Sequence, residues 1–172
     1  MTIHQRESTE QLTGVAETLI ITLYARFVET QRTDSLFQDS KAVEIVDRTN
    51  YNFDKYAKGW ASQLGVVIRV QEYDHIVKNF LEAHPNAVVV NLGCGLCTRF
   101  TRVDNGSVRW YEIDFPEVIE LRRKFFEENK RYQFIAKSIL DFSWINQIQR
   151  SPNQPLLILM EGVSPFLSEA EN

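Results

Sequence analysis

The chain has 172 residues, of which 44% are hydrophobic and 24% charged, enough for one globular domain with a substantial core. Its formal net charge of −4 gives no reason to expect nucleic acid or an anionic membrane as a partner. No apolar run is long enough to span a bilayer, no N-terminal stretch resembles a signal peptide, and the two cysteines form no disulfide framework. We therefore expect a cytoplasmic protein, and no cluster of side chains has the spacing of a metal site.

The first half of the chain has the apolar spacing of helices that pack against a core. Ser40 is expected to cap a short helix, and Gly65 is a point at which a longer helix could break. Residues 1–85 are predicted to form an N-terminal helical extension whose last helix covers a cofactor. The predicted helices are 14–28, 40–46 and 61–83, and a loop or lid is predicted over 50–56.

Arg69 lies in the third of these predicted helices, at the border of an apolar face that includes Val66, Val70 and Tyr73. An arginine at that position must find a partner or extend past the core to water. Two interpretations remain open for it. It is either a structural residue, as an ion pair or a side chain that extends to water, or a clamp for the carboxylate of a ligand, for which the guanidinium fork is well shaped.

The most informative stretch follows this helix. Residues 87–92 form a short run rich in valine that is typical of a buried parallel strand, and Gly93 and Gly95 come directly after it. The next predicted strand ends at Asp114, whose carboxylate could accept both hydroxyls of a ribose. Thr98 stands where a dinucleotide site has its third glycine, so the pattern favours S-adenosylmethionine over a dinucleotide.

Residues 86–172 alternate strands with helical stretches, which predicts a doubly wound α/β domain with a largely parallel sheet of four strands. The carboxyl ends of parallel strands share one edge, where ligands bind. That edge would carry Gly93, Asp114, Ser138 and Glu161. Strands are predicted at 87–92, 108–114, 132–136 and 156–160, helices from Pro116 and over 142–149, and the start of a helix at 168–172. The charged side chains of Arg122, Arg123 and Lys124 are expected to form a solvated face of the helix that begins at Pro116.

Residues 18–30, 65–77, 88–126 and 156–167 resemble a class I S-adenosylmethionine-dependent methyltransferase of the leucine carboxyl methyltransferase family. Within it they are most similar to the bacterial O-methyltransferases related to tetracenomycin polyketide biosynthesis. The resemblance implies a Rossmann-like sheet and S-adenosyl-L-methionine as the cofactor. It also implies roles for Arg69 on the methionine carboxylate, Gly93, Cys94 and Gly95 under the methionine and ribose, Asp114 on the ribose hydroxyls, Ser138 and Ile139 at the adenine, and Glu161 near the amino-acid end.

The sequence departs from the family in three respects. Cys97 and Ser138 each stand where family members often have Asp. Members are also longer, with more strands than the four predicted here. We therefore expect either a fragment or truncated product, or a partner that supplies the remainder, and strand 156–160 would then have an uncovered edge that allows self-association.

The resulting hypothesis is an S-adenosylmethionine-dependent O-methyltransferase acting on a hydroxyl or carboxylate of a small molecule, such as a polyketide. No residue is identified as a catalytic base. The main alternative is a truncated, inactive remnant that binds only cofactor or a partner. Two others are a thiol oxidoreductase, because Cys94 and Cys97 form a C-x-x-C motif, and a nicotinamide-dependent enzyme.

Overall fold

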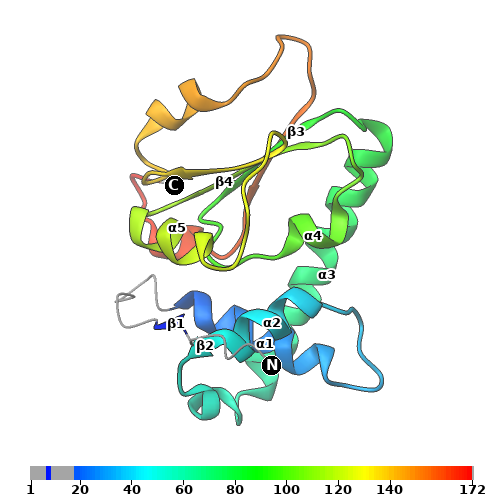
Figure 1. Ribbon diagram of the computed structural model, residues 1–172, viewed down its shortest axis with the longest axis vertical. Helices are drawn as coiled ribbons and strands as arrows, with labels where there is room; N and C mark the ends of the chain where they lie inside the picture. Colours follow the sequence, from blue (N-terminus) through cyan, green and yellow to red (C-terminus); the bar gives the residue numbers. More distant parts are fainter. Residues whose placement is uncertain (1–6, 9–17, 172) are drawn as a thin grey trace. The chain divides into compact units, whose positions relative to one another are not determined.

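The computed structural model describes residues 7–8 and 18–171 (Figure 1). These residues divide into two compact units, which are described separately. The helical unit contains the described residues up to Val77 together with Leu96–Val103, and the sheet unit contains Lys78–Gly95 and the described residues from Asp104 onward. In the described part of the chain, no helix has the length and hydropathy needed to cross a membrane. The predicted domain boundary at residues 85 and 86 stays a prediction.

The helical unit is built from α-helices and a minimal pair of parallel strands. Its first helix buries Leu19, Ile20 and Leu23, as the apolar spacing predicts, but it also buries Arg26 and Glu29. The part of the first predicted helix before Thr18 lies outside the described residues. The elements are β1 (Glu7–Ser8), α1 (Leu19–Thr30), α2 (Ser40–Arg48), β2 (Thr49–Asn50), the 3₁₀ helix η2 (Phe53–Tyr56), α3 (Trp60–Ala83, which continues into the sheet unit) and α4 (Arg99–Val103).

Three local predictions for this unit were wrong. Asp39, not Ser40, caps α2, because the Asp39 carboxylate accepts a hydrogen bond from the Ala42 N–H at 2.9 Å. Helix α3 runs unbroken through Gly65, since one glycine costs only about 1 kcal/mol inside a long helix. Residues 50–56 contain the end of β2 and the helix η2 in place of a loop.

The sheet unit contains four parallel strands in the order β5-β4-β3-β6, which confirms the predicted Rossmann-like α/β fold. The two central strands, β3 and β4, are almost wholly buried, as expected for strands covered on both faces. Because all four run in one direction, their carboxyl ends share one edge. The strands are β3 (Val88–Leu92), β4 (Arg109–Asp114), β5 (Tyr132–Ala136) and β6 (Leu156–Met160).

Each face of this sheet has its own cover, and Figure 1 shows the helix α5 (Pro116–Arg123) and the segment 142–147 on opposite faces. On one face Trp144, from the 3₁₀ helix η3 (Phe142–Gln147), packs on a buried cluster that includes Val90 and Tyr111. The alternate residues of β4, Trp110 and Glu112, are fully buried on the other face.

The prediction that the three consecutive charged residues of helix α5 and its end all face solvent was wrong. Arg122 is fully buried, whereas Arg123 is about half exposed and pairs with Glu128. The predicted start of a helix at 168–172 is also wrong for the described part, where residues 168–171 form only a turn after the short 3₁₀ helix η4 (Ser164–Phe166).

Strand β6 is the outermost strand of the described sheet on its side. Its side chains Leu156, Ile158 and Met160 are exposed by 37%, 50% and 38%, although they continue the apolar face that Trp144 covers farther along. The described sheet therefore has one apolar edge.

Candidate cofactor site

The loop after β3 is shaped by two glycines in the left-handed region, Gly93 with φ +65° and Gly95 with φ +49°. The N–H groups of Gly93 and Cys94 both donate to the Ile113 carbonyl, at 2.8 and 3.1 Å. These bonds fold the loop toward the end of the neighbouring strand β4. Cys94 and Gly95 are buried and Gly93 is half-buried, so the loop is part of the packed edge of the sheet.

Asp114, the last residue of β4, points its carboxylate toward this loop. Its Oδ2 accepts the Gly95 N–H at 2.7 Å, and its Oδ1 accepts the N–H of Phe115 at 2.8 Å. Burial raises the pKa of the Asp114 carboxyl above its ordinary value, although the two N–H groups and the charge of Arg122 act in the opposite direction. A carboxylate has about four lone-pair positions, so two remain for further donors such as a diol.

The end of β6 lies against the same loop. A Cβ at Gly93 would clash with a methyl carbon of Val163. Glu161, which is half-buried, directly follows β6 and precedes Gly162. The close approach of Val163 therefore brings the segment that carries Glu161 next to the glycine loop, and it leaves no room there for any side chain.

Ser138 and Ile139 follow β5 at the same edge. Ser138 Oγ accepts the Leu140 N–H at 3.2 Å, and the Ile139 carbonyl accepts the indole N–H of Trp144 at 3.0 Å. Ile139 also packs on the apolar cluster under the sheet. The sheet topology thus brings seven of the eight predicted residues to one edge, while their contact with a cofactor stays a prediction.

Arg69 is the eighth predicted residue, and it belongs to the helical unit. It lies half-buried on α3 between the buried Val66 and Val70, at the border of the apolar face as the sequence indicated. Its role as a carboxylate clamp stays a prediction.

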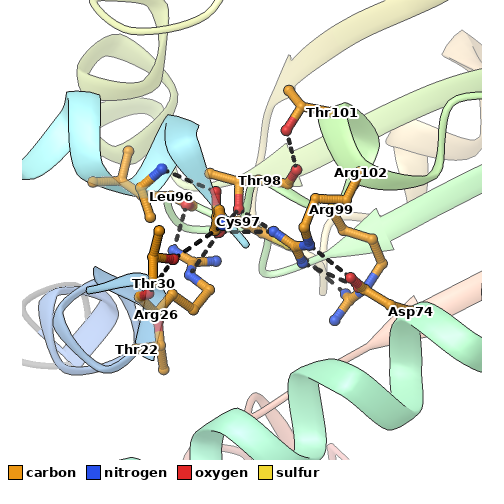
Figure 2. A network of polar contacts seen from close by, with 12 residues as sticks. Thr22, Arg26, Thr30, Asp74, Leu96, Cys97, Thr98, Arg99, Thr101 and Arg102 are labelled. Atoms are coloured by element: carbon orange, nitrogen blue, oxygen red, sulfur yellow. Dashed lines mark hydrogen bonds and ion pairs between the residues drawn. The ribbon is translucent and has the colours of Figure 1, made fainter. Parts of the chain in front are cut away.

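A buried ionic cluster in the helical unit holds the residues that follow the glycine loop (Figure 2). Arg102 bonds to both Asp74 (2.6 Å) and Asp39 (2.8 Å), and Arg99 donates to Asp74 at 2.8 Å. Thr98, fully buried, donates its hydroxyl to Asp39. Although burial opposes the charged form of Arg102, the neighbouring Asp74 and Asp39 raise the pKa of its guanidinium. The position that lacks the third glycine is therefore a structural anchor.

Cys97 and Leu96 belong to the same cluster. Arg99 Nη1 lies 3.7 Å from the sulfur of Cys97. Arg26 Nη2 donates to the Leu96 carbonyl at 2.8 Å, as Figure 2 shows. Arg99 also pairs with the carboxylate of Asp74, which lies on α3.

Sequence reasoning missed a second buried pair, Arg122 with Glu112, directly beneath the glycine loop. Arg122 Nη2 donates to Glu112 Oε1 at 2.8 Å, and both side chains are fully buried. Two signals could have revealed the pair. Arg122 lies one turn from the apolar residues Val118 and Phe126. Glu112 is flanked inside its strand by the aromatic Tyr111 and the apolar Ile113.

Comparison with known proteins is consistent with this geometry. The family model for leucine carboxyl methyltransferase matches residues 19–172. The chain is 36% identical over 164 residues to the tetracenomycin polyketide synthesis O-methyltransferase TcmP of Streptomyces glaucescens, covering 95% of this chain and 60% of that protein. It is 31% identical over 175 residues to the S-adenosyl-L-methionine-dependent methyltransferase dpfgK of Gibberella zeae, covering 93% and 58%. The chain thus spans about three fifths of the length of these relatives. It belongs to the leucine carboxyl methyltransferase family.

Proposed function

We propose that this chain binds S-adenosyl-L-methionine at the carboxyl ends of β3 to β6 and serves in methyl transfer to an oxygen of a small-molecule acceptor. The observation that carries the proposal is the Asp114 carboxylate, which faces the glycine loop and accepts the Gly95 N–H at 2.7 Å. Membership of a methyltransferase family supports the same cofactor, and so does the Gibberella zeae relative, which is an S-adenosyl-L-methionine-dependent methyltransferase. They favour this function over the thiol and nicotinamide alternatives.

The residues at this edge fit an adenosine sugar and a methionine chain. Asp114 offers the acceptors that a ribose diol needs, and the loop of Gly93, Cys94 and Gly95 lets a ligand approach the backbone closely. Ser138 and Ile139 are proposed to contact the adenine, Glu161 the amino-acid end, and Arg69 the carboxylate. When bound, the cofactor supplies an electrophilic methyl group, and the protein orients the partners and excludes water.

The acceptor is proposed to be a hydroxyl or a carboxylate, as in a polyketide. A carboxylate is already nucleophilic and needs no base, whereas an alcohol or phenol must lose a proton. None of the described residues is assigned to that task. A carboxylate acceptor would therefore make the smallest chemical demand on the described residues.

Calorimetric titration with S-adenosylhomocysteine tests the cofactor assignment. Wild-type binding that is lost in Arg69→Ala and kept in Arg123→Ala, an exposed arginine of α5, would support both the cofactor and the clamp. Absence of binding by the wild-type chain would refute the proposed function. Binding unchanged in Arg69→Ala would remove that residue from the site.

A methyl-transfer assay with a labelled methyl donor then separates an active chain from an inactive one. Small phenols and small carboxylic acids serve as acceptors. Mild alkaline hydrolysis distinguishes the products, because a methyl ester releases methanol and a methyl ether does not. Cofactor binding without transfer to either class would favour the inactive alternative.

A further inference from the structure

Arg122 contacts the glycine loop after β3. Its Nη1 donates to the Gly95 carbonyl at 2.8 Å, while the Gly95 N–H donates to Asp114 at 2.7 Å. Both polar groups of this one glycine are therefore held, on either side of a backbone in the left-handed region with φ +49°. Glycine has no side chain through which packing could fix its orientation, so these hydrogen bonds set the direction of its peptide groups.

Arg122 is itself held by several partners on the same face of the sheet. Glu112 accepts from its Nη2 at 2.8 Å, the Tyr132 hydroxyl accepts from the same nitrogen, and Asn91 donates to the other oxygen of Glu112 at 2.7 Å. The guanidinium carbon lies 4.2 Å from the ring centre of Phe126. Burial raises the pKa of the Tyr132 hydroxyl, so it keeps the proton that it donates to Glu112 Oε1 at 3.3 Å.

The buried pair of Arg122 and Glu112 is hard to explain by its contribution to stability alone. Burying two charges removes them from water, and an apolar pair of similar volume often gives an equally stable or more stable fold. A planar guanidinium offers something an apolar residue lacks, because it bonds to two acceptors in fixed directions. Here its acceptors include Glu112 and the Gly95 carbonyl, which lie on β4 and in the glycine loop.

We infer that Arg122 is a positioning residue for cofactor binding. It fixes the Gly95 peptide so that the loop keeps its N–H on Asp114 and its backbone in the shape that the ligand meets. Glu112, Asn91 and Tyr132 hold the guanidinium in place. The inference rests on the proposed function, because it concerns the same site.

The test uses a variant that removes both charges together. Arg122→Met alone would leave Glu112 buried without its cation, so the variant is Glu112→Gln/Arg122→Met. The control is Arg123→Met, the same change one residue along on an exposed arginine. Hydrogen exchange of the Gly95 amide is compared with that of Val90 within β3, which reports the stability of the sheet. If the loop is loosened, the exchange rate at Gly95 divided by that at Val90 should be about tenfold higher in the double variant than in the wild type. The same ratio should be unchanged in the control.

Titration with S-adenosylhomocysteine completes the test. In the double variant we expect binding about tenfold weaker than wild type, with the same urea midpoint or a higher one, and no change in the control. Unchanged affinity in the folded double variant would overturn the inference. If the wild-type chain did not bind at all, the proposed function would fail, and the exchange ratio alone would decide whether Arg122 fixes the loop.

Discussion

Asp114→Asn is the sharpest perturbation of the candidate site, because it keeps the size of the side chain and removes one acceptor oxygen. In the wild type, the two carboxylate oxygens accept the N–H groups of Gly95 and Phe115, at 2.7 and 2.8 Å. An amide has a single acceptor oxygen and two donor hydrogens. The amide oxygen at position 114 can accept a hydrogen bond from one of the two N–H groups, and the amide NH₂ group then faces the other N–H group, to which it cannot bond.

The magnitude follows from the hydrogen bonds lost. A bond to a charged acceptor contributes about 1.5–3 kcal/mol, and 1.4 kcal/mol corresponds to a tenfold change in affinity. Losing one bond from the ribose diol predicts binding of S-adenosylhomocysteine about 10- to 100-fold weaker. The unpaired N–H group at Gly95 or Phe115 is expected to lower the free energy of unfolding by about 1–3 kcal/mol.

The assay is calorimetric titration, with Asp104→Asn as the matched control. Asp104 precedes β4, whereas Asp114 ends it, and Asp104 also accepts a glycine N–H, from Gly106 at 3.0 Å. Its carboxylate pairs with Arg131 at 2.6 Å, so the control loses a comparable set of contacts away from the carboxyl edge. We expect the control to bind S-adenosylhomocysteine as the wild type does.

The pH dependence adds a second readout. Burial raises the pKa of free Asp114, and a bound diol, which donates to the ionised form, would lower it again. Affinity should therefore increase as pH rises through the raised pKa and level off above it, and this rise should vanish in Asp114→Asn. Equal affinity of Asp114→Asn and wild type at neutral pH would refute the ribose assignment.

Three further predictions concern stability and association. Asp39→Ala removes a buried carboxylate from Arg102 and should cost about 3–5 kcal/mol in urea unfolding, whereas the exposed Asp34→Ala should change little; similar costs would contradict the cluster's role. Hydrogen bonds from Lys137 and Ser143 lower the pKa of Asp141 to about 2, so the stability that ionised Asp141 contributes is lost as pH falls from 3.8 toward that value. Carbon-detected NMR titration should show the low pKa, and Lys137→Met should raise it. An ordinary pKa for Asp141 in the wild type would count against the pairing. Ile158→Lys on the apolar edge of β6 should reduce self-association in sedimentation velocity at rising concentration; identical profiles for variant and wild type would exclude that edge as the contact.

The elements with the strongest local pattern were predictable from sequence. The valine-rich run before Gly93 had to be a buried strand, and β3 covers residues 88–92 of the predicted 87–92. The helix caps and breaks were less predictable, because they depend on a few competing hydrogen bonds. Asp39 and Ser40 are both good caps in isolation, and only the path of the chain decides that the Asp39 carboxylate receives the Ala42 N–H.

By itself the sequence determined the order of strands and helices, the glycine turn and the placement of Asp114 at a strand end, because periodicity and backbone freedom are local properties. The tertiary structure alone decided which charges are buried. Arg122 and Arg123 are adjacent in one helix, yet the first lies fully buried against Glu112 and the second is about half exposed beside Glu128. The difference arises because helical rotation turns one toward a carboxylate on a distant strand, and a charge tolerates burial only where such a partner meets it.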